Sequence, residues 1–225
     1  MPSICKSIAA ACIALSAGAV AAVAGELDPV LQKIKDSGAM TVGYRENSIP
    51  MSYIADIQAQ PIGFALDLCG LVANKVKQTL GLADLKINYK PASAADAASL
   101  LKAREIGIDC GAAPVSAELE REAAFSTPVF VSELKWIVPR RLRVEREGRR
   151  RNYMATISPS STEDLKGMPV ALTRGAGATS LVLTLSSDRS LGLSILEGKD
   201  NAESFKLLET GKASAFIADD VLLVG

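Results

Sequence analysis

The stretch MPVALTRGAGATSLVLTL, residues 168–185, gives the clearest indication of the fold class. It predicts a strand at 168–174, a glycine-rich turn at 175–180 and an apolar helix from Leu181 onward. The turn lacks the lysine of a phosphate-binding P-loop, so it is either a ligand-binding turn of another kind or merely a tight connection. A strand that leads directly into a helix is the repeating unit of α/β proteins.

The same alternation continues on both sides of this stretch. Helices are predicted at 27–38, 62–81, 93–104, 116–125 and 201–211, and strands at 40–44, 85–90, 106–111, 130–139, 193–198 and 213–219. Short strands that alternate with helices favour an α/β architecture with a largely parallel sheet. We find no internal repeat of the length that solenoid proteins use.

Two regions of different composition divide the chain. Lys6, an apolar alanine-rich run at 8–23 and the motif Ala22-Val23-Ala24 together predict a secretory signal peptide over residues 1–24. Residues 139–161 are rich in arginine and poor in apolar side chains. We favour a solvated connecting segment over a basic patch for lipid or nucleic acid, because aromatic residues do not interleave the charges. These boundaries predict a first α/β lobe at 25–138 and a second at 162–225.

Composition restricts the chemistry that the protein can perform. The net formal charge of zero gives no reason to expect a nucleic-acid partner. The absence of histidine excludes Ser-His-Asp and Cys-His catalysis and ordinary zinc hydrolase sites, and we predict neither a metal nor a cofactor. Outside the signal peptide the cysteines are Cys69 and Cys110. They are compatible with a disulfide in an oxidising compartment and equally with two separate buried apolar residues.

Polar residues follow several predicted strands at their carboxyl ends, where open α/β sheets bind ligands. They are Arg45, the turn 111–116, Thr173 with its glycine-rich turn, and Asp219. A cation, two turns that lead into helix N-termini and a carboxylate together complement a zwitterion, that is, an amino acid. Each also has a plainer interpretation, with Arg45 as a surface residue beside Glu46 and Asp219 or Asp220 as a helix cap.

Five stretches carry a family resemblance. They are MTVGYRENSIPMSY (40–53), IGFALDL (62–68), GIDCGAAPVSAELEREAAFSTPVF (107–130), EDLKGMPVALTRG (163–175) and KDNAESFKLLETGKASAFIADDVLL (199–223). The sequence resembles the periplasmic substrate-binding proteins of polar amino-acid ABC transporters, especially their glutamate/aspartate-binding branch. The resemblance implies a type II fold of two α/β lobes that close on the ligand and catalyse nothing.

The resemblance also implies roles for individual residues. Arg45 would contact the side-chain carboxylate of the ligand, and Asp219 would receive its α-ammonium group. Thr173, Gly175 and Thr179 would hydrogen-bond the ligand from the second lobe. Asn201 stands where the acidic branch usually has a histidine.

The first lobe departs from the family pattern. Ala112, Ala113 and Pro114 replace hydroxyl residues, and Ala97 replaces an arginine typical of the acidic branch. The arginine that grips the α-carboxylate would fall near Leu119, which leaves Arg121 as its substitute and Ser116 as a replacement hydroxyl. Since hydrogen bonds to charged groups contribute roughly 1.5–3 kcal/mol each, the broader expectation is a polar amino acid or a related small organic anion.

The resemblance completes the functional expectation. We expect a monomer in the periplasm that captures a glutamate/aspartate-like amino acid and delivers it to ABC permease subunits. Similar proteins continue beyond the point where this sequence stops, so we expect a C-terminally truncated form. One alternative is a periplasmic dehydratase of cyclic carboxylates on the same scaffold, with Asp219 or Glu118 as general acid or base. Another is a sensory or degenerate binding module.

Overall fold

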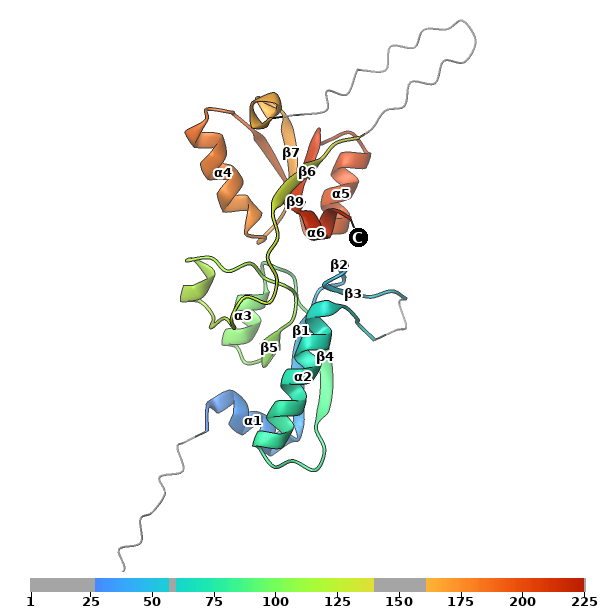
Figure 1. The fold of residues 1–225 in the computed structure, drawn as a ribbon, viewed down its shortest axis with the longest axis vertical. Helices are drawn as coiled ribbons and strands as arrows, with labels where there is room; N and C mark the ends of the chain where they lie inside the picture. The colour runs from blue at the N-terminus through green and yellow to red at the C-terminus, as the bar shows by residue number, and fades with distance from the viewer. Residues whose placement is uncertain (1–26, 57–59, 140–160, 225) are drawn as a thin grey trace, which may run out of the picture.

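The computed structural model describes residues 27–56, 60–139 and 161–224. The predicted signal peptide and residues 140–160 of the arginine-rich segment lie outside this part of the chain. The described residues form two α/β lobes that follow one another along the long axis of the molecule (Figure 1). None of the described helices is both long and apolar enough to cross a membrane.

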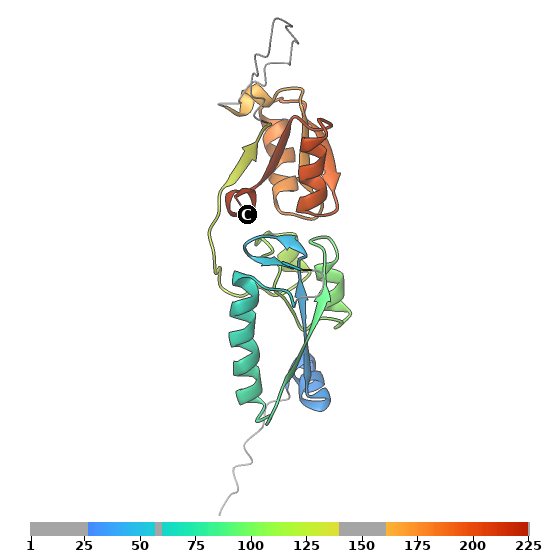
Figure 2. The ribbon, with the colours of Figure 1, turned by 90° about the vertical axis from the view of Figure 1, so that its right-hand side faces the viewer.

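The first lobe is built around a three-stranded parallel sheet. Its strands, in the order β4-β1-β5, are β1 (Ala39–Tyr44), β4 (Lys86–Pro91) and β5 (Ile108–Asp109). The other elements of this lobe are α1 (Pro29–Ser37), the hairpin strands β2 (Asn47–Ser48) and β3 (Ser52–Tyr53), α2 (Phe64–Thr79) and α3 (Ala97–Lys102). Figure 2 shows α2 lying along the sheet.

One face of β1 carries the core of this lobe. Met40, Val42 and Tyr44 alternate along the strand, are at most 7% exposed, and pack in one cluster with Leu66 and Cys69 of α2. This alternation is expected of a strand, because successive side chains point to opposite faces of its sheet. A disulfide joins Cys69 to Cys110, just after β5, with 6.4 Å between their Cα atoms. It resolves the two possibilities that the sequence leaves open.

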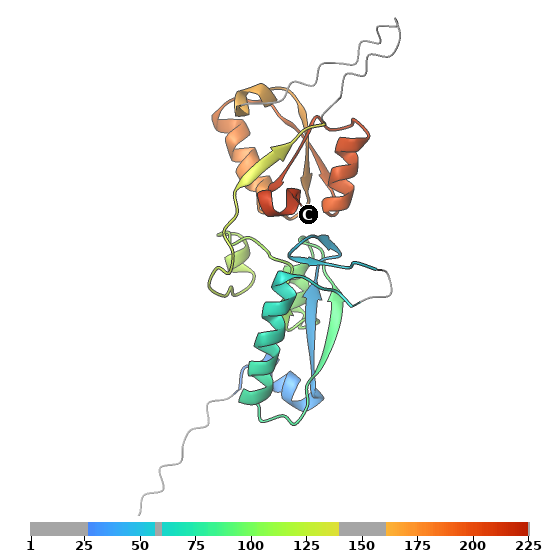
Figure 3. The same ribbon diagram turned by 45° about the vertical axis from the view of Figure 1, so that its right-hand side comes forward.

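The second lobe contains a four-stranded mixed sheet in the order β6-β9-β7-β8. The strands are β6 (Leu134–Ile137), β7 (Pro169–Thr173), β8 (Ser194–Gly198) and β9 (Ala215–Asp219), with β6 antiparallel to β9 and the other pairs parallel. The helices are α4 (Ala178–Asp188), α5 (Asn201–Glu209) and α6 (Asp220–Leu223). Figure 3 shows α4 and α5 on opposite sides of the sheet.

Alternate residues of the central strands face the two helices. Val170 and Leu172 belong to the cluster that includes Val182 of α4, whereas Ala171 and Phe216 belong to the one that includes Leu208 of α5. All six side chains are at most 4% exposed. A sheet covered on both faces needs near-continuous apolar strands, which is the pattern of residues 168–173. The predicted α/β class is therefore confirmed.

Two local predictions differ from the structure. The boundary at 138 places β6 in the first lobe, but β6 pairs with β9, so the chain crosses between the lobes before Leu134. The helix predicted at 116–125 is only a 3-10 turn, Leu119–Arg121. Its residues are half-buried or exposed, and a short helix without a buried face lacks the packing that sustains most helices in proteins.

The disulfide generates a stability prediction. The double substitution Cys69→Ala/Cys110→Ala should lower the free energy of unfolding by about 2–4 kcal/mol, because the bridge closes a loop of 41 residues in the unfolded chain. Urea unfolding followed by far-UV circular dichroism measures the change. Wild-type protein in reducing agent is the matched control and should unfold at the same midpoint as the double variant. Equal stability of oxidised and reduced wild type would contradict the prediction.

Candidate functional site

The carboxyl ends of the parallel strands of both lobes meet at one hollow of about 390 Å³. Arg45 follows β1, Pro91 ends β4 and Gly111 follows β5, while Thr173 ends β7. The remaining lining residues are Glu46, Asn47, Ser48, Ala92, Ser93, Ala94, Ala95, Asp96, Ala112, Ala113, Pro114, Arg174, Lys199, Asp200, Asn201 and Leu222. Both lobes contribute polar side chains, so the hollow has the place and the chemistry of a ligand site in an α/β protein.

Arg45 is buried at the first-lobe side of this hollow. Its two terminal nitrogens donate to the two carboxylate oxygens of Asp109 at 2.8 and 2.9 Å, and Nη1 also donates to the Ala92 carbonyl at 2.8 Å. The side chains of Arg45 and Asp109 are 9% and 8% exposed. The suggested surface pairing of Arg45 with Glu46 is therefore wrong, because a buried partner from β5 holds the guanidinium instead.

Gly111 makes room for this guanidinium. A Cβ atom at position 111 would lie 2.2 Å from Cζ of Arg45 and 2.4 Å from Nη1, well inside van der Waals contact. The backbone after β5 therefore packs directly on the guanidinium group. Glycine is needed here for close approach.

Thr173 and Asn201 lie together on the second-lobe side. The Thr173 hydroxyl donates to Oδ1 of Asn201 at 2.7 Å and lies 3.1 Å from Oγ of the fully buried Ser204. Nδ2 of Asn201 donates across the hollow to the Asn47 carbonyl and to Oγ of Ser48, both at 3.3 Å. Asn201 thus lines the hollow and also joins the lobes.

Further contacts bring the lobes into direct apposition. Nδ2 of Asn47 donates to Oδ2 of Asp200 at 3.2 Å. The glycine-rich turn meets the first lobe: a Cβ on Gly175 would lie 2.6 Å from the Ala95 nitrogen, and one on Gly177 would lie 2.5 Å from Cγ of Pro114. The turn therefore serves at least as an interlobe contact, where small residues allow the two backbones to approach.

Asp219 and Asp220 have separate surroundings. Asp220 accepts from Nζ of Lys135 at 3.1 Å, and this hydrogen bond lowers the pKa of its carboxyl and raises the pKa of Lys135. Asp219 accepts from Oγ of Ser132 at 2.8 Å and lines a second hollow of about 150 Å³. The interpretation of Asp219 as a helix cap holds by position, since α6 begins after it, but its side chain makes no capping hydrogen bond.

The hollow beside Asp219 adjoins the larger one. Both are lined by Ala112, Ala113, Pro114 and Leu222, so the 112–114 stretch separates Arg45 from Asp219. The two charged residues predicted for opposite ends of the ligand thus lie in neighbouring hollows along the same interlobe face.

Four predicted site residues line neither hollow: Gly175, which packs on Ala95, and Ser116, Arg121 and Thr179. Ser116 accepts from the Leu119 N–H at 3.2 Å and so starts the 3-10 turn. Arg121 is exposed, and its Nε donates to the Ala117 carbonyl at 3.0 Å. Oγ1 of Thr179 is buried without a hydrogen-bond partner among the described residues. Arg121 therefore does not replace the missing arginine of the first lobe in this structure.

Sequence reasoning missed several residues at the site. Asn47, Ser48, Asp109, Asp200 and Ser204 make its principal hydrogen bonds. The polar turn after β1 and the acidic residue at the end of β5 were visible signals. Their partners were not, because Asn47 and Asp200 are 153 positions apart in the sequence.

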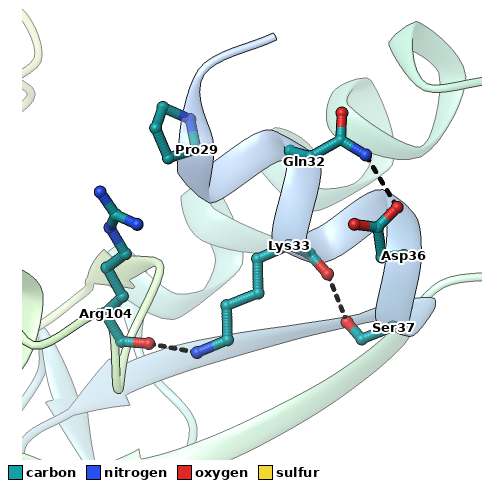
Figure 4. Close-up of a pocket in the computed structure, with 6 residues that line it drawn as sticks. All are labelled: Pro29, Gln32, Lys33, Asp36, Ser37 and Arg104. Atoms are coloured by element: carbon teal, nitrogen blue, oxygen red, sulfur yellow. Dashed lines mark hydrogen bonds between the residues drawn. The ribbon is translucent and has the colours of Figure 1, made fainter.

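A further surface hollow lies beside α1, in the part of the first lobe that is remote from the second lobe (Figure 1). Figure 4 shows that its polar groups bond to one another: Gln32 to Asp36, Ser37 to the Lys33 carbonyl, and Lys33 to the Arg104 carbonyl. Because these groups are engaged with one another, they do not present a set of hydrogen-bond donors oriented toward a ligand. Among the described residues, no cluster of three or more His, Cys, Asp or Glu side chains is arranged to hold a metal ion.

Two α/β lobes with polar residues converging between them define a solute-binding protein of the two-lobed type II class. The profile of the bacterial extracellular solute-binding proteins, family 3, matches residues 40–211, and the chain belongs to this family. It is 34% identical over 203 residues to the L-glutamate/L-aspartate-binding protein of Pseudomonas aeruginosa, covering 90% of this chain and 62% of that protein. It is 31% identical over 215 residues to the glutamate/aspartate import solute-binding protein of Escherichia coli, covering 95% and 66%. The chain thus spans less than two thirds of the length of these curated relatives.

Solved structures agree on the fold. A mutant of the arginine-binding protein ArgBP from T. maritima superposes with a TM-score of 0.68 at 19% identity, covering 87% of this chain and 74% of that one. The cysteine-binding protein of Campylobacter jejuni gives a TM-score of 0.65 at 22% identity, covering 86% and 68%. At these identities the likeness concerns the fold alone, and it confirms the predicted two-lobed architecture.

The packing of Gly111 on Arg45 generates a second prediction. Gly111→Ala should lower the free energy of unfolding by about 1–3 kcal/mol, because the new methyl group overlaps the guanidinium and forces it from its buried position. Urea unfolding measures the loss. The matched control is Gly70→Ala in α2, where a Cβ meets nothing within 4 Å and alanine should stabilise the helix by up to about 1 kcal/mol. Equal effects at the two positions would refute the packing argument.

Proposed function

We propose that this protein is an exported solute-binding protein that captures a polar amino acid between its lobes and delivers it to an ABC importer. The observation that carries the proposal is the interlobe hollow, which Arg45 and Thr173 line from strand ends of the two lobes and Asn201 lines from the start of α5. Glutamate and aspartate are the first ligands to test, because the relatives from Pseudomonas aeruginosa and Escherichia coli are named for them.

In this proposal each lobe supplies part of the binding energy. The two N–H groups of Arg45 not used by Asp109 or Ala92 would donate to an oxygen of the ligand, and Thr173 would act from the other side. Asp219 would attract the ammonium group from the adjoining hollow. Micromolar affinity requires about 8 kcal/mol, which a few charge-assisted hydrogen bonds can supply.

Capture would be coupled to the approach of the lobes. Asn201 donates to Asn47 and Ser48, and Asn47 donates to Asp200, so the second lobe engages the turn after β1. The same interlobe face holds the ligand hollow. Ligand contacts to both lobes would therefore favour the apposed arrangement over a separated one, as differential binding requires.

The setting of this activity is also part of the proposal. Membership of an extracellular solute-binding family supports export, with the periplasm as the compartment and permease subunits as the partners. The first lobe would extend from residue 25 to the residue before β6, and β6 together with residues 162–225 would form the second lobe, connected through the segment 139–161. We propose a monomer that binds without catalysis. Glu118, one carboxylate considered for a dehydratase, is exposed and lines neither interlobe hollow.

A binding titration tests the proposal. Isothermal titration of the purified protein with glutamate, aspartate, glutamine and asparagine should give at least one dissociation constant in the micromolar range or below. Asp219→Asn should weaken that binding roughly ten- to a hundredfold, because an amide no longer attracts the ammonium group.

Asp188→Asn is the matched control, since Asp188 is exposed at the end of α4 and lines neither hollow. Its affinity should equal that of the wild type. Failure of all four amino acids to bind would overturn the proposed function. An Asp219 variant that binds as tightly as the Asp188 variant would remove Asp219 from the site.

A further inference from the structure

The charge of Arg45 is cancelled inside the protein. Both oxygens of the Asp109 carboxylate accept from its terminal nitrogens, and both side chains are at least nine-tenths buried. A buried bidentate pair of this kind has no net charge, so its attraction for an anion is weaker and falls off faster with distance than that of an unpaired guanidinium. Arg45 therefore offers N–H donors to the hollow without offering it a net positive charge.

The remaining charges of the hollow do not restore a positive field. Its other cations, Arg174 and Lys199, are 60% and 75% exposed and lie 3.4 and 3.9 Å from carboxylates of Glu197 and Asp200. Glu46, Asp96 and Asp200 also line the hollow, and Asp219 lines the adjoining one. Over the described residues of this site, with Asp109 included, carboxylates outnumber cationic side chains.

Apart from the exposed Arg174, no other arginine of the described chain lines the hollow. Arg121, the one side chain that could have supplied a second guanidinium to the first lobe, is exposed and bonded to the Ala117 carbonyl. A ligand with two carboxylates and one ammonium would bring a net negative charge into a site that already has an excess of carboxylates. An amide side chain of the same shape avoids this cost, and its oxygen accepts equally from Arg45.

We propose that Asp109 makes this site select amino acids with uncharged polar side chains, the carboxamides, over the dicarboxylates. The inference rests on the proposed function, because it concerns the side chain of the amino acid captured in the same hollow. Asp109 is a positioning residue: it orients Arg45 and cancels its charge without lining the hollow. Its effect on the ligand is electrostatic, so it should appear in the ratio of affinities for a carboxylate and its isosteric amide.

The first test uses wild-type protein alone. Isothermal titration at low ionic strength should give glutamine a dissociation constant equal to or lower than that of glutamate. If asparagine and aspartate bind, the dissociation constant of asparagine should likewise be equal to or lower than that of aspartate. Glutamate and aspartate binding more tightly than their amides would overturn the inference and leave the proposed function standing. If none of the four binds, the proposed function fails and the inference falls with it.

The second test changes Asp109. Asp109→Asn keeps the shape of the side chain and leaves the charge of Arg45 uncompensated. The ratio of glutamate affinity to glutamine affinity should therefore rise by roughly ten- to a hundredfold. Asp109→Glu keeps the charge and is the matched control, whose ratio should stay within about threefold of the wild type. The ratio is informative because a loss of structure alone would weaken both ligands together. A shift below about threefold in Asp109→Asn would overturn the role of Asp109.

A double variant covers the case in which Asp109→Asn does not fold, since a buried guanidinium without its partner is destabilising. Arg45→Gln/Asp109→Asn removes both charges and leaves two amides of similar shape. If the wild-type pair acts as a neutral unit, the double variant should keep the wild-type ratio of glutamate to glutamine affinity within about threefold. A double variant whose ratio falls further toward glutamine would show that Arg45 attracts the dicarboxylate in the wild type, and would overturn the inference.

Discussion

The buried pair of Arg45 and Asp109 connects the three strands of the first sheet at the edge where the candidate site lies. Arg45 follows β1, its Nη1 donates to the Ala92 carbonyl after β4, and Asp109 ends β5. Gly111 packs on the guanidinium from the next turn of chain. Removing one partner of a buried ion pair usually costs about 3–5 kcal/mol, so this group of contacts constrains which residues can occupy the strand ends.

Small residues allow the two lobes to meet over this edge. Gly175 and Gly177 lie against Ala95 and Pro114, where side chains would hold the backbones apart. Polar bonds from Asn201 to the turn after β1 complete the apposition. The site is therefore formed by two sheets whose strand ends face each other, and both lobes supply the residues that line it. Such an arrangement couples ligand capture to lobe movement in the proposed function.

The sequence predicted the α/β class and most elements because hydropathy patterns are local. The strand at 168–174 and the helix after it appear as β7 and α4, with Val170, Ala171 and Leu172 fully buried as an apolar run implies. The helix predicted at 116–125 failed because its residues are half-buried or exposed and give it no fully buried face, which periodicity alone does not reveal. The assignment of β6 failed because its partner β9 is about 80 positions further along the chain.

The local pattern of the sequence was enough to identify the strand ends that carry polar residues, and Arg45, Thr173 and Asp219 all lie at the interlobe face. Local patterning suffices for this, because parallel strands place their carboxyl ends at one edge of a sheet. The partner of each of these residues depends on the packing of the whole fold. That packing paired Arg45 with Asp109, turned Asn201 toward Asn47 and Ser48, and left Arg121 at the surface. Charge compensation is a property of distances between side chains, and those distances are set by the packing of segments that are remote in the sequence.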